Sequence, residues 1–356
     1  KIPTPAVLSV KPLNELFSDV KYNPLPLRIP EEAIAAFEGY FKAFNSQQSV
    51  SVVHPFYPVS NESSIYIIGS AIQLSGNARA FIDAVIKIRS SITWDAALYA
   101  PVLATPENAA LLSYAGIDLV DEVLPVFLAF KDVYLTQEGE YGIEDLKELP
   151  CTCSICQNIT AEHLRKLPKA KRAELLARHN CLKLDEELRK IRWFIRAQSL
   201  REYVEGKCRS STWLTAALRL LDYNYSYLEE RTPVTRRSVL IANSMESLNR
   251  VEVRRFAGRI KERYRAPVSS ILLLLPCSAR KPYSTSPSHS KFIEALGKPR
   301  AKVHQVIITS PLGIVPRELE IVYPAAHYDV AVTGIWDLEE RRWVESCLYD
   351  FLTQNK

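Results

Sequence analysis

Side chains that can do chemistry are unusually dense in residues 276–292, PCSARKPYSTSPSHSKF. This segment directly follows the aliphatic run SSILLLL, whose pattern predicts a buried strand. Cys277 would therefore leave that strand at the carboxyl edge of a parallel sheet, where open α/β sheets bind ligands. Because a free thiol is only slightly ionised at neutral pH, a nucleophilic cysteine needs positive charge nearby. Arg280, Lys281 and His289 are placed to supply it.

The serines and prolines of the same segment admit two interpretations. Ser284, Ser286 and Ser288 can donate hydrogen bonds to a substrate, while the prolines restrict the conformations of the loop. Alternatively, Cys277 is a small packing residue at the end of a strand, as lone cysteines usually are, and the serines only form turns. Ordering a loop costs about 1–2 kcal/mol per residue, and this cost favours a functional loop.

A second group of reactive side chains is a cysteine cluster. Three of the seven cysteines fall within six residues, as Cys151, Cys153 and Cys156. In a cytosolic chain such crowding indicates metal binding rather than disulfides. With His179 they form a Cys3His set, which is typical of a closed, structural zinc site. Cys181 and His163 stay open as alternatives for the fourth ligand, and loss of the metal is expected to unfold this region.

An alternation of strands and helices is predicted to position the first part of the chain. Strands are expected at 64–71, 96–102 and 117–123, and amphipathic helices at 77–92 and 105–116, the latter with Thr105 as its cap. This order indicates a parallel sheet with right-handed crossovers. The stretch is too short to build a whole eight-fold barrel.

The rest of the chain is predicted to be helical and then α/β again. A helix is also expected near the N-terminus at 30–44, residues 160–223 read as almost continuous helix, and 229–238 read as a polar linker. Beyond the linker we expect strands at 239–242, 268–275, 302–310 and 329–334, and helices at 247–264, 288–298 and 338–354.

The composition is that of a globular protein and argues against a membrane-spanning one. Apolar residues make up 47% and charged residues 24% of the 356 residues. The longest apolar run has the length of a strand and falls short of the ~18 residues that span a bilayer. Residues 1–25 show no signal-peptide pattern, so we expect a cytoplasmic protein of two or three domains.

The net charge of +5 is modest, but the positive charge is unevenly distributed. Residues 157–210 contain 14 lysines and arginines against 7 acidic residues, and residues 231–265 are also rich in arginine. Basic faces of this kind favour a polyanion such as RNA. The alternative is a set of solvated helix faces without a partner.

Several segments around the cysteines resemble tRNA-guanine transglycosylases. LYAPVLATPENAALLSYAGIDLVDEV, VYLT, CTCSIC and RHN occur in the order and spacing of that family, over about residues 65–225. The resemblance implies that His179 completes the zinc site and that Asp121 stands where the transglycosylase nucleophile would be. It covers only the later part of that barrel, so residues 1–228 are predicted to form a degenerate, partial transglycosylase-like (β/α) domain.

Residues 276–292 resemble the signature of archaeosine synthases, an archaeal branch related to the transglycosylases. The matching positions are Pro276, Cys277, Lys281, Pro282, Tyr283, Ser286, Ser288 and His289. Residues 310–337 resemble the same domain. We therefore predict a Rossmann-like α/β catalytic domain over residues 239–356, joined by the linker at 229–238.

The resemblance implies a tRNA-modifying transferase of archaeosine biosynthesis. Such an enzyme adds free lysine to the nitrile of 7-cyano-7-deazaguanine at position 15 of tRNA, which yields an amidine, and a radical-SAM partner then cleaves the adduct. We expect Cys277 to attack the nitrile, Lys281 to lower the thiol pKa or stabilise the imide anion, and His289 to shuttle protons. Tyr283 and Ser286 complete the expected catalytic set. Direct addition of the amine, without a covalent step, is the rival mechanism.

The resemblance leaves the substrate-binding residues and some partners open. Candidates for binding lysine or lining the pocket are Asp121, Arg317, Glu318, His327, Asp329 and Asp337. Archaeosine synthases usually carry a C-terminal RNA-binding PUA domain, for which the sequence to Lys356 offers no match. That module is then either a further part of a longer chain or a separate partner protein, and no membrane partner is expected.

Two other functions compete with this interpretation. An active transglycosylase would exchange a base through Asp121, although the partial barrel argues against it. A non-catalytic tRNA-binding subunit would leave the dense chemistry of residues 277–289 without a purpose.

Overall fold

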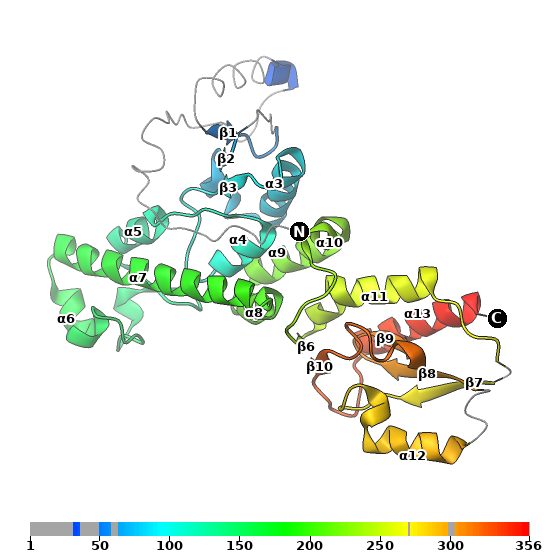
Figure 1. Ribbon diagram of the computed structural model, residues 1–356. Helices are drawn as coiled ribbons and strands as arrows, with labels where there is room; N and C mark the ends of the chain where they lie inside the picture. The colour runs from blue at the N-terminus through cyan, green and yellow to red at the C-terminus, as the bar shows by residue number, and fades with distance from the viewer. Residues whose placement is uncertain (1–30, 36–49, 58–62, 270, 298–302, 356) are drawn as a thin grey trace. The chain divides into compact units, whose positions relative to one another are not determined.

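The computed structural model of the chain describes residues 31–35, 50–57, 63–269, 271–297 and 303–355. Most of the helix expected at 30–44 lies outside these residues. The secondary structure is a mixture of helices and short strands, as Figure 1 shows, and the expectation of an α/β protein is confirmed.

The chain divides into two compact units. One contains the described residues up to Arg196 together with Gly206–Leu221, and the other contains Ala197–Glu205 together with the described residues from Asp222 onward. Helix α10 (Tyr225–Arg231) and the expected linker at 229–238 both belong to the second unit. The domain boundaries expected from the sequence stay a prediction.

The first unit is built on a parallel sheet. Strands β1 (Ser51–Val53), β2 (Ile65–Ile68) and β3 (Ala97–Tyr99) lie in that order, and both neighbouring pairs are parallel. The strands expected at 64–71 and 96–102 are thereby confirmed, whereas β1 was not expected. Nearly all of these strand residues are buried, as in parallel sheets covered on both faces.

The strand expected at 117–123 is not formed. Only Leu119 pairs with β3, through a single parallel bridge to Tyr99. Two residues later the Asp121 carboxylate accepts a hydrogen bond of 2.8 Å from the backbone N–H of Val123, and helix α5 (Val123–Phe130) begins there. The Asp121 side chain thus hydrogen-bonds to the backbone two residues later, and this local bond ends the extended segment.

The two helices that follow β2 and β3 agree with the sequence pattern, apart from one boundary. Helix α3 (Ala78–Ser91) is capped by Asn77 and buries its apolar face. Helix α4 (Ala109–Ala115) ends at Gly116, whose φ of 111° suits a glycine. It begins four residues after Thr105, because Thr105 and Asn108 form a hydrogen-bonded turn with an N···O distance of 2.9 Å.

The cysteine cluster lies beside a hairpin and a long helix. The antiparallel hairpin consists of β4 (Val133–Leu135) and β5 (Glu140–Gly142). Helix α6 (Ala161–Lys166) then leads into α7 (Lys169–Arg196), which packs on β4. Helices α8 (Leu200–Lys207) and α9 (Thr212–Tyr223) follow. The nearly continuous helix expected over residues 160–223 is confirmed.

The second unit contains two small sheets. Strand β7 (Ile271–Pro276) pairs in parallel with β8 (Val303–Thr309), which pairs antiparallel with β9 (Gly313–Pro316). Strand β6 (Leu240–Ala242) pairs in parallel with β10 (Tyr328–Val330). The unit is therefore α/β, but its described strands form a mixed arrangement and do not establish a Rossmann-like sheet. The hairpin to β9 was not expected from the sequence.

The prediction that β7 is buried is wrong. Leu273 and Leu275 face the core, but Ile271, Leu272 and Leu274 are exposed. Strand β7 lies at the edge of the sheet formed by the described strands, so its outer side chains meet solvent. A continuous aliphatic run suggests burial on both faces, and an edge position removes part of that cover.

Helices α11 (Val251–Arg263) and α13 (Leu338–Gln354) pack together in this unit, and Figure 1 shows them side by side beyond β9. Both helices are where the pattern predicts them. Gly313 of β9 has a φ of +79°, and an added Cβ would lie 2.5 Å from the Cys347 Sγ of α13. This position therefore requires glycine, which lets strand and helix approach closely.

Among the described helices, none is both long and apolar enough to cross a membrane. The longest, α7, has 28 residues but carries charged side chains along its length.

Candidate functional site

The cysteine cluster forms a candidate metal centre in the first unit. The ligand atoms of Cys151, Cys153, Cys156 and His179 all lie within 4.8 Å of one another. The Nδ1 atom of His179 is 3.5 Å from the Cys153 Sγ and 3.4 Å from the Cys156 Sγ. Three sulfurs and one imidazole nitrogen around a common point fit a tetrahedral metal ion.

The surroundings of His179 fix the ring for this role. Its Nε2 lies 2.9 Å from the backbone carbonyl oxygen of Leu135, which leaves Nδ1 to face the sulfurs. Tyr134 stacks on the imidazole at a centroid distance of 3.9 Å, and its hydroxyl is 3.3 Å from the Cys156 Sγ. Burial lowers the pKa of His179 to about 4, so the ring is neutral and can act as a ligand.

The two alternative ligands lie outside the cluster. The Cys181 thiol interacts instead with Glu122, and burial and that carboxylate raise its pKa to about 12. His163 is exposed on α6. Of the three candidates for the fourth ligand, His179 is the one that lies with the cysteines, and its role as a ligand stays a prediction.

Asp121 is buried and fully occupied. One carboxylate oxygen accepts hydrogen bonds from the Tyr99 hydroxyl at 2.7 Å and the Val102 backbone N–H at 2.8 Å. The other accepts the N–H that starts α5. These contacts give the carboxylate a structural role at the start of α5.

The segment 276–292 leaves the carboxyl end of β7 as expected. Cys277 is exposed, directly after the strand. Within the part of the chain that the structure describes, its thiol makes no hydrogen bond, but it interacts electrostatically with Lys281, Tyr283 and Tyr328. The thiol is thus open to a substrate and lies close to a cation.

Lys281 is held against an aromatic ring. Its Nζ lies 3.9 Å from the centroid of the Tyr328 ring, in cation–π geometry. Partial burial lowers the pKa of Lys281 below its ordinary value, although Asp329 and Cys277 oppose that shift. Asp329 is exposed and accepts a hydrogen bond from the backbone N–H of Val330. A half-buried ammonium beside the thiol can stabilise developing negative charge.

A chain of hydroxyl groups lies beneath this site. The Tyr283 hydroxyl is 2.6 Å from that of Tyr328, which is 2.6 Å from the Thr309 hydroxyl. Both tyrosines are buried, and burial raises their pKa values, to about 12 for Tyr328. Neutral hydroxyls in sequence can donate hydrogen bonds but do not act as bases at neutral pH.

His289 is buried and both of its ring nitrogens are engaged. Nε2 lies 2.9 Å from the Pro276 carbonyl oxygen, and Nδ1 lies 2.7 Å from an Nη of Arg317. Because a guanidinium only donates, Nδ1 must accept and Nε2 must carry the proton. Burial and Arg317 lower the pKa of His289, which agrees with a neutral ring. The imidazole therefore fixes the backbone just before Cys277.

Arg317 is itself positioned by buried polar groups. Its guanidinium donates to Glu320 at 2.9 Å and to the Gln305 side chain at 3.3 Å. Glu320 also accepts the backbone N–H of Ser284 at 3.0 Å. The carboxylate, the guanidinium and the imidazole thus link both ends of the loop. Arg317 is committed to these contacts rather than exposed for a substrate carboxylate.

Ser286 is the N-cap of helix α12 (Pro287–Leu296). Its buried hydroxyl accepts the backbone N–H of His289 at 3.2 Å and lies 3.2 Å from the Ser288 hydroxyl. The cap begins the helix that places the imidazole under the loop. Arg280 is exposed.

The remaining candidates have other neighbours. Glu318 contacts the Tyr264 hydroxyl and lies 3.8 Å from His304. Asp337 caps α13 by accepting the N–H groups of Glu339 and Glu340. His327 is exposed and its ring centroid is 6.2 Å from that of Tyr323. Asp329 therefore lies near Lys281, whereas Glu318 and Asp337 make their contacts away from it.

Three residues of the site escaped the sequence reasoning: Thr309, Glu320 and Tyr328. Tyr328 lies on β10 and Thr309 ends β8, so only the folded chain brings them to Cys277's loop. Tyr328 is also a core residue of this unit. No local sequence pattern pointed to these three residues, since 310–337 is mostly apolar.

Two family models match the chain. One, described as queuine tRNA-ribosyltransferase, matches residues 52–212, and one described as a domain of unknown function matches residues 253–356. The candidate metal centre lies in the first matched region, whereas Cys277 and Lys281 lie in the second.

The curated relatives include archaeosine synthases. An archaeosine synthase subunit alpha of Methanosarcina acetivorans is 56% identical over 294 residues, which are 83% of this chain and 47% of that protein. An archaeosine synthase of Haloferax volcanii is 46% identical over 290 residues, 82% of this chain and 48% of that protein. The resemblance to archaeosine synthases is confirmed.

The transglycosylases are more distant from the chain than these two archaeosine synthases. A tRNA-guanine(15) transglycosylase of Methanothermobacter thermautotrophicus is 31% identical over 292 residues, 81% of this chain and 44% of that protein. The chain spans about half the length of the curated archaeosine synthases that it matches.

Proposed function

We propose that the chain carries the nitrile-modifying site of a tRNA-modifying transferase of the archaeosine synthase type. The substrate is 7-cyano-7-deazaguanine at position 15 of tRNA, and free lysine is the second substrate. The observation that carries the proposal is the exposed Cys277 thiol beside the half-buried Lys281 ammonium, at the carboxyl end of β7. A nitrile carbon is electrophilic, and this pair offers it a nucleophile and a stabilising charge.

The covalent route is balanced without any oxidant or reductant. The Cys277 thiolate adds to the nitrile carbon, a C–S bond forms, and the nitrogen takes a proton to give a thioimidate. The side-chain amine of lysine then attacks the same carbon. The tetrahedral intermediate collapses, the C–S bond breaks, and the thiolate leaves a substituted amidine. The sum is addition of one amine to one nitrile.

The side chains around the thiol divide this work. Lys281 stabilises the thiolate and the imide nitrogen, and Tyr328 holds the ammonium in place through its ring. We assign His289 a positioning role instead of the expected proton transfer, because both of its ring nitrogens are engaged. Tyr283 and Ser286 likewise support the loop, and Asp329 is the remaining candidate for contact with the lysine substrate.

The proposal extends to metal and partners. Zinc would be held by Cys151, Cys153, Cys156 and His179, where it supplies cross-linking of the loop to α7 and no chemistry. A radical-SAM enzyme would cleave the lysine adduct, and a PUA module, on a longer chain or on a separate protein, would assist in binding tRNA. The Rossmann-like description of the second unit is likewise a proposal.

One incubation tests the function. The protein is mixed with cyano-modified tRNA and lysine, and the nucleosides are analysed by mass spectrometry. We expect a nucleoside heavier by the mass of one lysine, and an unchanged mass would contradict the proposal. Without lysine, a covalent complex between protein and tRNA is expected.

Substitution of the thiol tests the covalent step. Cys277→Ala is expected to lower the rate of adduct formation by about three orders of magnitude or more, because removal of a nucleophile abolishes the covalent route. Cys347→Ala removes another thiol of the same unit and serves as the control. Undiminished adduct formation by Cys277→Ala would establish direct amine addition instead.

A further inference from the structure

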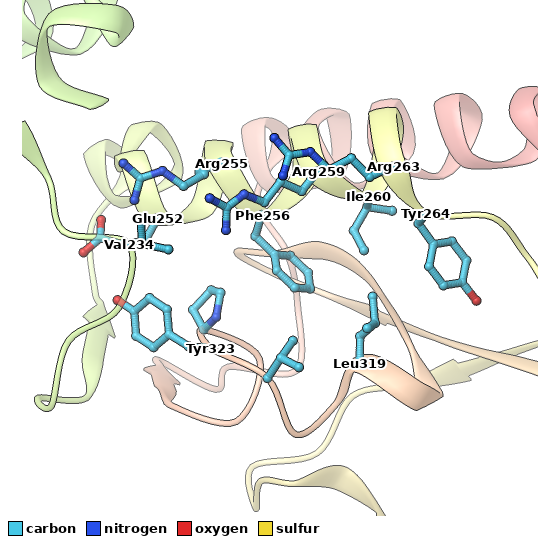
Figure 2. A pocket seen from close by; sticks show the side chains of 12 residues that line it. Val234, Glu252, Arg255, Phe256, Arg259, Ile260, Arg263, Tyr264, Leu319 and Tyr323 are labelled. Carbon is cyan, nitrogen blue, oxygen red and sulfur yellow. The ribbon is translucent and has the colours of Figure 1, made fainter. Parts of the chain in front are cut away.

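A second concave site lies in the same unit as Cys277, but it contains none of the residues of the candidate catalytic site. It is a pocket of about 380 Å³ between helix α11 and the segment 319–324. Figure 2 shows the arginine side chains of α11 along one side of it and Leu319 and Tyr323 on the other.

The bottom of the pocket is apolar. Phe256 and Ile260 of α11 are buried in the core of the unit, and Leu319 and Pro324 add apolar surface from the other side. Such a surface can pack against a planar ring or a sugar.

The rim of the pocket is basic, and its three arginines differ in their partners. Arg255, Arg259 and Arg263 follow one another at intervals of four residues on one face of α11. Arg255 is buried and committed to the chain itself, since it donates to Glu229 at 3.1 Å and to the Pro233 carbonyl at 2.9 Å. Its guanidinium is therefore not free for a ligand.

Arg259 and Arg263 are exposed, and within the described residues neither makes an ion pair or a hydrogen bond. Several other arginines of this unit are paired with carboxylates, as Arg250 is with Glu205 at 2.7 Å. Two unpaired, planar guanidinium groups beside an apolar pocket suit an anionic ligand that offers pairs of oxygens to their N–H groups, such as a phosphate.

Tyr323 contributes its ring to the lining of the pocket. Its hydroxyl is shielded from solvent and lies near Glu252 and Arg236, which are 3.7 Å apart. The side chain therefore adds apolar surface and offers no polar group to a ligand.

We propose that this pocket binds a phosphate of an RNA backbone, with Arg259 and Arg263 on the phosphate and the adjoining ribose or base against Phe256 and Ile260. The inference takes only the identity of the partner, RNA, from the proposed function. The two guanidinium groups lie one helical turn apart along an open rim, which fits a chain of phosphates better than a single enclosed anion.

Binding of an unmodified tRNA transcript tests the pocket without any chemistry at the nitrile. The full chain is compared with the double variant Arg259→Gln/Arg263→Gln, and Kd is measured at several KCl concentrations. We expect binding to weaken about tenfold or more and the slope of log Kd against log salt to fall by about 1 to 2, as for the loss of one or two phosphate contacts.

The control removes the same charge elsewhere. Arg341→Gln/Arg342→Gln alters two exposed arginines of α13 that do not line the pocket, and its Kd should change by less than about threefold. Equal losses in both double variants, or no RNA binding by the wild type, would overturn the inference. Circular dichroism checks that each variant is folded.

The outcome is separable from that of the proposed function. A chain that binds the transcript through the pocket but converts no nitrile would refute the transferase and leave the pocket assignment intact. A chain that converts the nitrile with unchanged Kd in the pocket variant would refute only the pocket.

Discussion

The charge of Lys281, in the loop that carries Cys277, can be tested by varying the pH. Burial lowers the pKa of its ammonium, so Lys281 loses its charge at a lower pH than an exposed lysine does. If that charge stabilises the thiolate and the imide, the rate must fall as pH rises through the lowered pKa. An arginine keeps its charge over the whole range.

We therefore predict that Lys281→Arg shifts the alkaline fall in rate to higher pH. Lys281→Met should lower the rate by about 10²-fold at pH values where the wild-type lysine is charged, and the difference should shrink above its pKa. The pH dependence of adduct formation, followed by nucleoside mass spectrometry, provides the measurement. The Arg280→Met variant, which alters an exposed cation of the same loop, should retain the wild-type profile. Coincident pH profiles for wild type and Lys281→Arg would show that titration of Lys281 does not cause the fall in rate at high pH.

His289 distinguishes a positioning residue from a proton carrier. Its Nε2–H donates to Pro276 while its Nδ1 accepts from Arg317, and a glutamine amide offers one donor and one acceptor as well. We predict that His289→Gln retains activity within about tenfold and keeps the pH profile. His289→Ala should lose more, because the Pro276 carbonyl and one N–H of Arg317 then lack their hydrogen-bond partner, at a cost of about 1–3 kcal/mol each.

Adduct formation and urea unfolding of both variants test this assignment. A proton carrier would lose about 10²- to 10⁴-fold in rate on substitution by glutamine, together with one limb of the pH profile. That result with unchanged stability would restore the proton-transfer role that the sequence suggests.

At the scale of elements, the metal centre joins a short loop to the long helix α7. Cys151, Cys153 and Cys156 lie in a stretch with little regular structure, so few other contacts hold it. We predict one metal ion per chain in the native protein, and its removal by a chelator should unfold this loop because the binding energy is folding energy. Cys153→Ser is expected to lose the metal.

Atomic emission measures the metal content. Hydrogen exchange over residues 146–180 measures whether the loop unfolds when the metal is removed. Cys181→Ser is the matched control, because this thiol lies two residues from His179 but contacts Glu122. Loss of metal in the control, or unchanged exchange after chelation, would contradict the assignment of the four ligands.

A buried ionic network ties α8 to the start of α11. The Glu205 carboxylate lies 2.7 Å from Arg250 and 2.8 Å from Arg201, and the Arg250 side chain is fully buried. Burial opposes ionisation of Glu205, but the two guanidinium groups outweigh it and lower its pKa to about 2. A lowered carboxyl pKa means stability that is complete above the unfolded pKa and is lost as pH falls toward the folded one.

We predict that Glu205→Gln lowers the free energy of unfolding by about 1–3 kcal/mol at pH 7, because Arg201 and Arg250 each lose one carboxylate partner but keep Asp222 and Glu202. The loss should shrink as the pH is lowered from about 4.5 toward 2. Urea unfolding at several pH values measures both effects. Glu345→Gln, at an exposed position of α13, should change stability by no more than ~0.5 kcal/mol.

Such networks also show where sequence reasoning stops. The spacing of Cys151, Cys153 and Cys156 predicts a candidate metal site because these cysteines are close in sequence. The contact of His289 with Arg317 joins residues far apart in the chain, and no periodicity reports it. Arg317 therefore looked like a group for binding lysine, although it serves the loop instead.

At the scale of the whole molecule, the pattern predicted most helices and the α/β class but not how each strand is covered. The aliphatic run of β7 has the composition of a central strand, yet its neighbours leave Leu272 and Leu274 exposed. Hydrophobic periodicity indicates which side chains are suited to burial. The order of the strands in the sheet determines which of them are actually covered. The antiparallel turn into β9, which completes that sheet, depends on Gly313 and its contact with Cys347.

The excess of positive charge is a property of the whole chain, and it should make the affinity for tRNA depend on the salt concentration. Phosphate contacts release counterions, so each one adds about −0.9 to the slope of log affinity against log salt. We predict that the KM for cyano-modified tRNA rises steeply with KCl, while kcat, which reflects chemistry at Cys277, changes little. The KM for free lysine, measured in the same salts, is the control and should vary far less. A KM for tRNA that stays constant between low and high salt would mean that phosphates contribute nothing to recognition, and the net charge of +5 would then have no part in the function.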